Sequence, residues 1–516
     1  MGPLVHLALR LVARVIQRSD AWIAGLLFGC SAVLSIWWAS NDGLGAFGGD
    51  NAVYMLTARH YSPLLPPDPV AREFAEKSTY PPLYPLSLAA VADSLRSAHV
   101  VTALELAAAL AMLYVWVCAA GLPRPAALTL VALFAIAPGT YLAALELHSE
   151  MLYLALSLLA LHLMARNVDS GRDVALVALA VSAAILTRTA GIALFPALGA
   201  AILRAPKKSW PWAVAGVVPL IAWHVLHAHG GSYVHVLLEG GGSPPELWER
   251  LRSGIASSVE GWTLDWMPVR TSVVADALLV LALLAIVRRI WRMCPDAWYA
   301  ATYLAVIVIW NFSAEDIRLV WVIAPVMLGQ LLLELHQFGV RLTPTYPSLV
   351  MSAAVAVLAV CVVPNAALAF QRERLAAIAE IPVARYVPEW YAPDLDMAEK
   401  YAATYIATDR ALAKASTMVP AGDCILTIKP AVVALQTGRR TVALPAGDVS
   451  QAEFSAVVRE SGCRYILMLA YISPTYRMPL YPQQRLVAGE FEERFRERAV
   501  LSSGASPDAA ILVELK

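Results

Sequence analysis

Six ionisable residues stand in the polar segments between apolar runs, close to the ends of those runs, where a charge is costly and usually has a function. They are Asp50, Glu146, His148, Glu150, Arg188 and Arg318. Carboxylates and histidine can move protons during a reaction, and the planar guanidinium of arginine binds phosphate through paired N–H groups. Together these residue types indicate acid–base chemistry on a phosphorylated substrate.

Asp50 lies in the segment GGDNAVYMLTARHY, shortly after the first apolar run. Gly-Gly-Asp-Asn before a helical pattern is a good helix N-cap, so one interpretation is structural. The other is a general base that takes the proton of an acceptor hydroxyl. The two roles are compatible if the carboxylate faces the substrate.

Glu146, His148 and Glu150 alternate in the segment LELHSEMLY. In a helix the two glutamates share one face, and in an extended segment all three side chains point the same way. Three interpretations stay open: a divalent-metal site, the lining of a polar substrate pocket, and plain solvation at a membrane interface. The two-residue spacing is only a weak metal signal.

Arg188 and Arg318 are cations between apolar runs, in ILTRTAGI and SAEDIRLVW. Each has a structural interpretation, which is snorkelling toward lipid headgroups or, for Arg318, pairing with the nearby acids Glu315 and Asp316. The functional alternative is that both arginines grip one phosphate or pyrophosphate group.

The composition is that of a polytopic membrane protein. Of the 516 residues 59% are hydrophobic and 15% charged, whereas a soluble chain carries roughly 25% charged residues, and the mean hydropathy is +0.61. Lys+Arg and Asp+Glu are equal at 39 each, which indicates no nucleic acid or other polyanionic partner. No small-residue cleavage site follows the first apolar run, so we expect it to be a retained helix.

About eleven apolar runs predict transmembrane helices. They are residues 21–39, 98–119, 126–145, 150–165, 174–187, 190–203, 211–227, 272–287, 297–312, 319–338 and 348–370. Lys and Arg recur in alternate connections, which predicts a cytoplasmic N-terminus and an outer C-terminal tail. This topology places the six ionisable residues on the outer side of the membrane.

Two long outer loops follow from this topology, residues 40–97 and 228–271. Within the first, residues 78–95 (STYPPLYPLSLAAVADSL) are amphipathic and predict an interfacial helix, with a short extra span as the alternative. The second is rich in Gly and His and is a candidate lid over the site. Its histidines are His227, His229 and His235.

The chain becomes soluble in composition after residue 370. We therefore divide it into a membrane domain, residues 1–370, and an outer α/β domain, residues 371–516, in which strands and helices alternate and AAILVELK adds a last strand. Cys424 and Cys463 each begin a predicted strand. An outer compartment permits a disulfide between them, but two free buried thiols are equally compatible with the sequence.

The order of these motifs resembles the membrane-embedded GT-C glycosyltransferases over roughly residues 20–340. The resemblance is carried by Asp50 after the first span, YPPLYPLSLA in the first loop, the acid at the head of SEMLYLALSLLALHL, LTRTAGIALFPAL and DIRLVWVIAPVML. It is nearest to the family 39-like branch, which includes protein O-mannosyltransferases and lipid A aminoarabinose transferases. The chain departs from that pattern at Asn51, where a second acid is frequent, at Leu319, where Tyr is usual, and at Tyr80, which replaces a lysine.

The resemblance implies a GT-C fold and an enzyme that transfers a sugar from a polyprenyl-phosphate donor to a hydroxyl on the outer membrane face. Asp50 matches the catalytic acid, Glu150 the second-loop acid and Arg318 the late arginine. We expect inversion at the anomeric carbon, with Asp50 as general base. Arg318, Arg188 and Tyr80 would bind the donor phosphate. The sugar or acceptor pocket would be lined by Glu146, His148, Glu150, Tyr84 and Arg59.

This interpretation requires no cofactor and leaves a divalent metal open. The expected partners are the lipid donor, membrane lipids and a lipid, glycan or protein acceptor, and we expect a monomer in a bacterial cytoplasmic membrane. Two alternatives remain: a glycan ligase that uses a polyprenyl-pyrophosphate donor, and a flippase or transporter of a lipid-linked sugar. A transporter would be expected to show paired internal repeats, and none is clear in the sequence.

Overall fold

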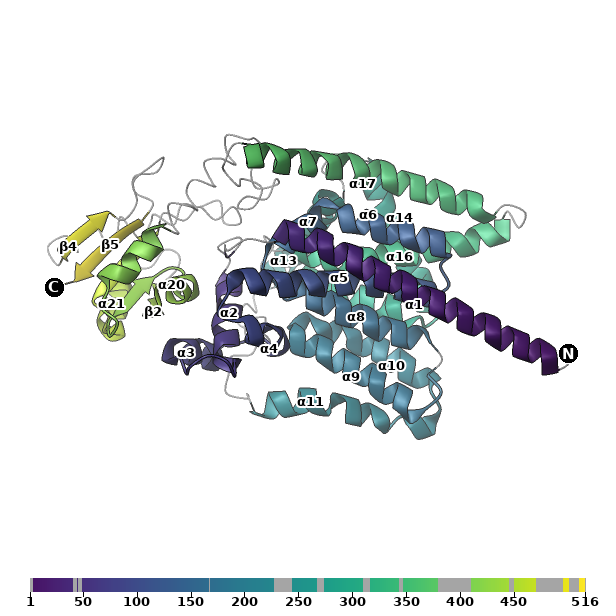
Figure 1. Cartoon of the computed structure of the whole chain (residues 1–516), viewed down its shortest axis with the longest axis horizontal. Helices are drawn as coiled ribbons and strands as arrows, with labels where there is room; N and C mark the ends of the chain where they lie inside the picture. Colours follow the sequence, from purple (N-terminus) through teal and green to yellow (C-terminus); the bar gives the residue numbers. More distant parts are fainter. Residues whose placement is uncertain are drawn as a thin grey trace. The chain divides into compact units, whose positions relative to one another are not determined.

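A computed structural model describes most of the chain. The described residues are 3–39, 44, 49–166, 168–226, 244–266, 273–309, 316–342, 347–378, 410–444, 450–469, 495–500 and 510–515. They divide into two compact units (Figure 1). One unit comprises residues 1–41, 79–84 and 96–367, and the other residues 42–78, 85–95 and 368–516. The first loop is therefore grouped with the C-terminal domain.

The first unit is a helical bundle. Its helices are α1 (Pro3–Ala39), α5 (Leu95–Ala119), α6 (Arg124–Ile136), α7 (Pro138–Leu145), α8 (Glu150–Ala165), α9 (Gly171–Thr187), η2 (Thr189–Ala193), α10 (Leu194–Arg204), η3 (Lys207–Ser209), α11 (Trp212–Leu226), α13 (Pro244–Trp266), α14 (Val273–Trp291), α15 (Pro295–Ile309), α16 (Asp316–Leu342) and α17 (Pro347–Ile378). Each predicted apolar run contains a helix. Local signals set several ends: Ser170 and Asp173 form a capping box at the start of α9.

The predicted count of about eleven spans is not confirmed by the lengths of the helices in the described residues. Within the described residues three helices are long and apolar enough to cross a membrane, 20–39, 95–119 and 318–342, and a fourth results if α6 and α7, bent by 59°, form one broken span. Four further apolar helices are shorter. The bend falls at Ala137, whose extended backbone precedes Pro138, because proline disfavours a helical residue before it.

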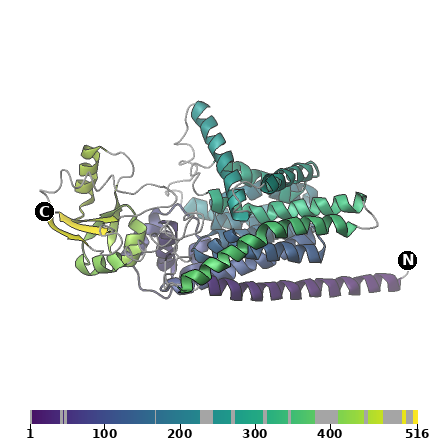
Figure 2. The ribbon, with the colours of Figure 1, turned by 90° about the horizontal axis from the view of Figure 1, so that it is seen from above.

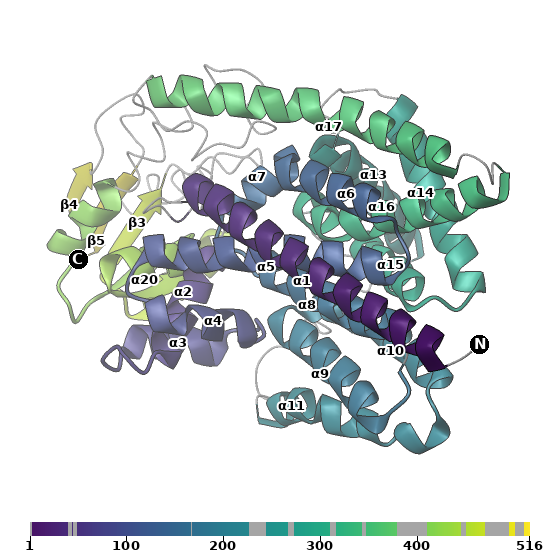
Figure 3. The same ribbon diagram turned by 45° about the vertical axis from the view of Figure 1, so that its right-hand side comes forward.

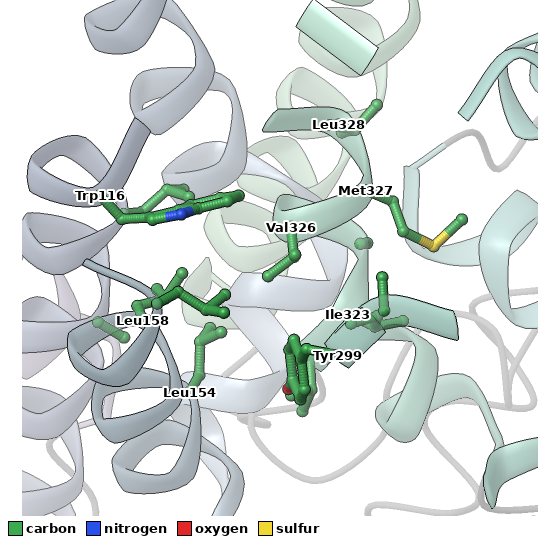
Figure 4. Packing of buried hydrophobic residues seen from close by; sticks show 14 of the residues in the cluster. Trp116, Leu154, Leu158, Tyr299, Ile323, Val326, Met327 and Leu328 are labelled. Atoms are coloured by element: carbon green, nitrogen blue, oxygen red, sulfur yellow. The ribbon is translucent and has the colours of Figure 1, made fainter. Parts of the chain in front are cut away.

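Helix α16 is the centre of the bundle. Its apolar window is 89% buried, against 22% for that of α1, which lies along one side of the bundle (Figure 2). Side chains from four helices meet at α16 (Figure 4). Those labelled are Trp116 from α5, Leu154 and Leu158 from α8, Tyr299 from α15, and Ile323, Val326, Met327 and Leu328 from α16 itself. Because α16 is packed on most sides, its first turn, which begins at Asp316, is held in place by the rest of the bundle.

The predicted outer loop 228–271 contains a long helix in its second half. Residues 244–266 form the 23-residue helix α13, which packs against α15 and α16. Gly254 allows this, because a Cβ there would meet the backbone of Val308. On the other side of the bundle α9 and α11 lie side by side (Figure 3). His227, His229 and His235 lie outside the described residues.

The second unit begins with the first-loop helices α2 (Gly49–Tyr61) and α3 (Pro69–Lys77). Asp68 caps α3, accepting from the backbone N–H groups of Val70 and Ala71 at 2.8 and 3.2 Å. The segment predicted as an interfacial helix forms only α4 (Leu83–Leu88) and the single turn η1 (Ala89–Val91). These are too short to span a bilayer.

The C-terminal part of the second unit is the predicted α/β domain. It contains β1 (Cys424–Thr427), α20 (Pro430–Thr437), β2 (Arg440–Ala443), α21 (Gln451–Ser461), β3 (Tyr465–Leu469), β4 (Phe495–Val500) and β5 (Ala510–Leu515). The sheet order is β2-β1-β3-β5-β4, with β1 parallel to β2 and β3, and β5 antiparallel to β3 and β4. The last strand is confirmed, and β4 was not predicted.

A disulfide braces this sheet. Cys424 and Cys463 are bonded, with their Cα atoms 4.9 Å apart, which settles the alternative left open by the sequence. The bond ties β1 to the residue that leads into β3. In the chain-entropy model a loop closed over 39 residues stabilises the fold by about 4 kcal/mol.

Candidate active site

The acid of the second outer segment begins a helix. Helix α7 ends at Leu145, and residues 146–149 connect it to α8, whose first residue is Glu150. A carboxylate in the first turn interacts favourably with the helix dipole. Glu150 is only 2% exposed, so its charge must be compensated by neighbouring groups.

Two arginines from distant segments provide that compensation. Arg188 is the residue that ends α9 and leads into η2, and Arg318 lies in the first turn of α16. Arg188 Nη1 is 2.8 Å and Arg318 Nε 3.1 Å from the same oxygen, Oε1 of Glu150. Arg188 also donates to Ser149 Oγ at 3.3 Å. One buried carboxylate thus lies between two cations.

His148 links the remaining acid to Arg318. Its Nδ1 is 2.9 Å from Oε2 of Glu146, and its Nε2 is 3.1 Å from Nη1 of Arg318. Arginine can only donate, so Nε2 accepts and Nδ1 carries the proton that is donated to Glu146. Five of the six residues first identified in the sequence therefore form one cluster, here called the outer cluster: Glu146, His148, Glu150, Arg188 and Arg318.

The charge state of His148 is set by opposing neighbours. Burial and Arg318 lower the pKa of His148, whereas Glu146 and Glu150 raise it, and the net direction is upward. The contact with Arg318 nevertheless requires a neutral acceptor at Nε2. Protonation therefore becomes favourable when Arg318 turns toward another partner, such as an anion, because the imidazolium then faces two carboxylates.

Three buried tyrosines next to the cluster were not predicted. Tyr153 Oη lies 3.2 Å from Tyr299 Oη and donates to the Ala190 carbonyl at 3.5 Å. Tyr303 stacks on Tyr153 with ring centres 6.1 Å apart and lies within electrostatic reach of the cluster's buried charges. The available signal was the spacing of Tyr299 and Tyr303, four residues apart in an apolar run.

The structure does not arrange Glu146, His148 and Glu150 as ligands around a common metal position. Over the part of the chain that the structure describes, no group of three or more His, Cys, Asp or Glu side chains is arranged to hold a metal ion. Glu150 faces two arginines instead. The cluster is suited to bind an anion, since both cations converge on one point.

Asp50 belongs to the other unit, in the first turn of α2. The next residue, Asn51, is 1% exposed and donates from Nδ2 to the Leu44 carbonyl at 2.6 Å.

At the far end of α2, Arg59 donates to the Ala92 carbonyl at 3.2 Å. Burial lowers the pKa of Arg59, opposed by Asp68 and Asp93. This tie to a backbone carbonyl differs from the pocket role predicted for Arg59.

Of two predicted site tyrosines, Tyr80 lies just before α4 and Tyr84 in its first turn. Tyr84 is fully buried and its hydroxyl is 2.9 Å from Thr102 Oγ1, so it packs on α5 in this structure. Tyr80 is partly exposed and is in the same unit as the outer cluster. Its role in phosphate binding stays a prediction.

Comparison with known proteins identifies similar solved structures but no matching protein family. No family model matches the chain, and no curated protein matches it. A structure of ArnT from Cupriavidus metallidurans bound to undecaprenyl phosphate is similar over 96% of this chain and 98% of that one, at 16% identity and a TM-score of 0.46. The structure of the same protein in the apo state is 15% identical to this chain, with a TM-score of 0.45, and the similarity again covers 96% of this chain and 98% of that one.

The arabinofuranosyltransferase AftD from Mycobacteria is also similar. The similarity covers 97% of this chain and 40% of AftD, at 15% identity and a TM-score of 0.42. At these similarities we transfer no residue role from either protein to this chain.

Proposed function

We propose that this chain is a membrane glycosyltransferase that moves a sugar from a polyprenyl-phosphate donor to an acceptor hydroxyl. The observation that carries the proposal is the convergence of Arg188 and Arg318 on one buried oxygen, 2.8 and 3.1 Å away, beside apolar helices. A paired cationic site at the edge of an apolar bundle fits a ligand with an anionic head and a lipid tail. The resemblance to GT-C enzymes, carried by Asp50, Glu150 and Arg318, supports the same assignment.

The reaction we propose is a single displacement at the anomeric carbon. Asp50 takes the proton of the acceptor hydroxyl while its oxygen forms the new bond to the sugar. The bond between the anomeric carbon and the phosphate oxygen breaks, and its electron pair stays on the phosphate. Arg318 and Arg188 stabilise the added negative charge on the departing lipid phosphate. A phosphate leaving group needs no general acid, so one catalytic carboxylate suffices.

The remaining cluster residues would bind substrate. Glu146, His148 and Glu150 offer carboxylate and imidazole groups to sugar hydroxyls, next to the phosphate site.

We place the reaction on the outer face of a bacterial cytoplasmic membrane. The Cys424–Cys463 disulfide supports this orientation, because disulfides persist in oxidising compartments. The distribution of Lys and Arg in the sequence supports it independently.

The test is transfer by the purified full-length chain in proteoliposomes. A panel of undecaprenyl-phosphate monosaccharides is supplied with a bacterial envelope extract as acceptor source, and released undecaprenyl phosphate is measured. We expect release with at least one donor, at least about a thousandfold less in Asp50→Asn, and donor binding within about twofold of wild type in that variant.

Other outcomes would overturn parts of the proposal. Turnover in Asp50→Asn above about a tenth of wild type, a barrier change under about 1.4 kcal/mol, would exclude Asp50 as general base. Release only from pyrophosphate-linked donors would identify a ligase. Movement of intact donor across the bilayer without release would identify a flippase.

A further inference from the structure

Helix α2, which carries Asp50, is tied at both ends by side chains that donate to backbone carbonyls. Asn51 Nδ2 donates to Leu44 O, seven residues earlier in the chain, at 2.6 Å. Arg59 Nε donates to Ala92 O at 3.2 Å. All four residues belong to one compact unit. The first tie is adjacent to Asp50, and the second is nine residues away, about 13 Å along the helix.

The rest of α2 is held by packing. Ala52, Tyr54, Met55 and Ala58 are at most 3% exposed, and the helix packs on α3 and on α20 of the disulfide-braced domain. Packing along the middle of a helix fixes its axis. The position of the first turn depends on contacts made at that end of the helix, and the bond from Asn51 to Leu44 is such a contact.

Only a donor at position 51 can make this bond. Leu44 O is an acceptor, and an ionised aspartate or glutamate is an acceptor only. The second acid that is frequent in similar sequences therefore could not replace Asn51 here. A carboxylate would leave the Leu44 carbonyl without this donor, which is unfavourable for a buried group, and would place a second negative charge beside Asp50.

We infer that Asn51 is a positioning residue for Asp50: its amide fixes the first turn of α2 by holding the Leu44 carbonyl, and so sets where the Asp50 carboxylate lies. This inference rests on the proposed general-base role of Asp50. A displacement of about 1 Å in a reacting group can cost about a hundredfold in rate, so a single buried hydrogen bond is sufficient to control turnover.

The experiment compares four substitutions in the full-length chain. Asn51→Ala removes the donor, Asn51→Asp replaces it with an isosteric acceptor, and Asn51→Gln keeps an amide. The matched control is Thr57→Val, because Thr57 is also on α2, is 3% exposed, and has a hydroxyl without a hydrogen-bond partner among the described residues. Turnover per folded molecule, donor affinity and amide hydrogen exchange of α2 are measured.

We expect Asn51→Ala and Asn51→Asp to lower kcat about a hundredfold with donor affinity within about twofold of wild type. Asn51→Gln should retain more activity than either, and Thr57→Val should keep full activity. Hydrogen exchange should rise in the first turn of α2 but not around Arg59. In Asn51→Asp the activity should also begin at higher pH, because a second carboxylate disfavours ionisation of Asp50.

A purely structural role for Asn51 would lower thermal stability without changing kcat of the folded protein, and would overturn the inference. If Asn51→Ala does not fold, the comparison of Asn51→Gln with Asn51→Asp decides. Asp50→Asn separates the two proposals. Full activity in that variant removes the general base itself, whereas an inactive Asp50→Asn beside fully active Asn51 variants removes only the positioning role.

Discussion

Two buried charged clusters lie on the same helix, α16, and they are built in opposite ways. The outer cluster has an anion at its centre: Glu150 lies between Arg188 and Arg318. The second, here called the inner network, has a cation at its centre: Arg289 lies between Asp296 and Glu334.

The inner network consists of Arg288, Arg289, Arg292, Asp296, Glu334 and Gln337. Arg289 is 7% exposed, with Nη2 2.8 Å from Asp296 and Nη1 3.3 Å from Glu334. Arg288 and Arg292 reach Glu334 from more exposed positions, both at 3.1 Å. Sixteen residues separate Arg318 from Glu334, which is about 24 Å along the helix.

The order of charges determines what each cluster can bind. In the inner network Glu334 is also shared by several arginines, but the buried Arg289 keeps a second carboxylate, Asp296, as a partner. This pairing joins the α14–α15 connection to α16 and leaves the buried arginine enclosed. In the outer cluster two arginines share one carboxylate oxygen, so an incoming anion can take the place of Glu150 as their common partner. Similar residue types therefore support fold stability at one site and ligand binding at the other.

The largest expected effect is on stability, at the inner network. Arg289→Ala leaves Asp296 and Glu334 buried without their central partner, which typically costs about 3–5 kcal/mol. Thermal unfolding in detergent should show this loss, while the folded fraction keeps wild-type affinity for undecaprenyl phosphate. The control is Arg288→Ala, whose more exposed pair should contribute at most about 1 kcal/mol. Reduced lipid-phosphate affinity in folded Arg289→Ala would refute the assignment of this network to structure alone.

The next effect is on donor affinity, at the outer cluster. Arg318→Ala should weaken binding of a fluorescent polyprenyl phosphate about 10- to 100-fold, since a hydrogen bond between charged groups contributes about 1.5–3 kcal/mol. The measurement is a binding titration on the purified chain. Arg318 is more exposed than Arg289, so the loss of stability should be the smaller of the two. Equal affinity in wild type and Arg318→Ala would remove this arginine from the phosphate site.

A substitution of Glu150, the acid shared by both arginines of the outer cluster, tests how this cluster differs from the inner network. Glu150→Gln removes the charge that competes for both arginines, so phosphate affinity should rise about tenfold while thermal stability without ligand falls. Added inorganic phosphate should restore that stability by mass action.

Asp296→Asn is the matched control at the inner network, because Arg289 then keeps Glu334 as a buried partner. It should also destabilise the protein, but phosphate should neither bind more tightly nor restore stability. A gain of phosphate affinity in this variant as well would mean that the order of charges does not distinguish the two clusters.

Most elements of the fold were predictable, and the misses have physical causes. Each apolar run contains a helix because burial of a hydrophobic stretch requires an internally hydrogen-bonded backbone. Helix α13 was missed because its sequence mixes charged residues, Trp and Gly, and its helical structure depends on packing against α15 and α16. Strand β4, FRERAV, was missed because charged residues hide its alternation, and it is defined by pairing with β5.

The site was predictable residue by residue but not as an arrangement. Position between apolar runs identified Arg188, Arg318 and Glu150 separately. Nothing in the sequence could place both arginines on one oxygen, because that depends on how α9 and α16 pack around α8. The same limit applies to Arg59, whose charge indicated a pocket role but whose geometry ties two segments of backbone together.

The smallest expected effect is the pH dependence of donor binding, which only the outer cluster should show. The pKa of His148 is raised above its ordinary value by Glu146 and Glu150, against burial and Arg318. A bound phosphate adds an anion beside His148 and draws Arg318 away, so His148 takes up a proton on binding. This favourable contribution is present at low pH and is lost as pH rises through the raised pKa. An undecaprenyl-phosphate monosaccharide is a phosphodiester of constant charge in this range, so its affinity should fall about three- to tenfold from about pH 6 to about pH 8.5. His148→Gln should flatten the profile, because the amide keeps hydrogen-bonding groups but cannot take up a proton. A profile unchanged by this substitution would show that another group carries the pH dependence and that Arg188 and Arg318 alone set the charge of the site.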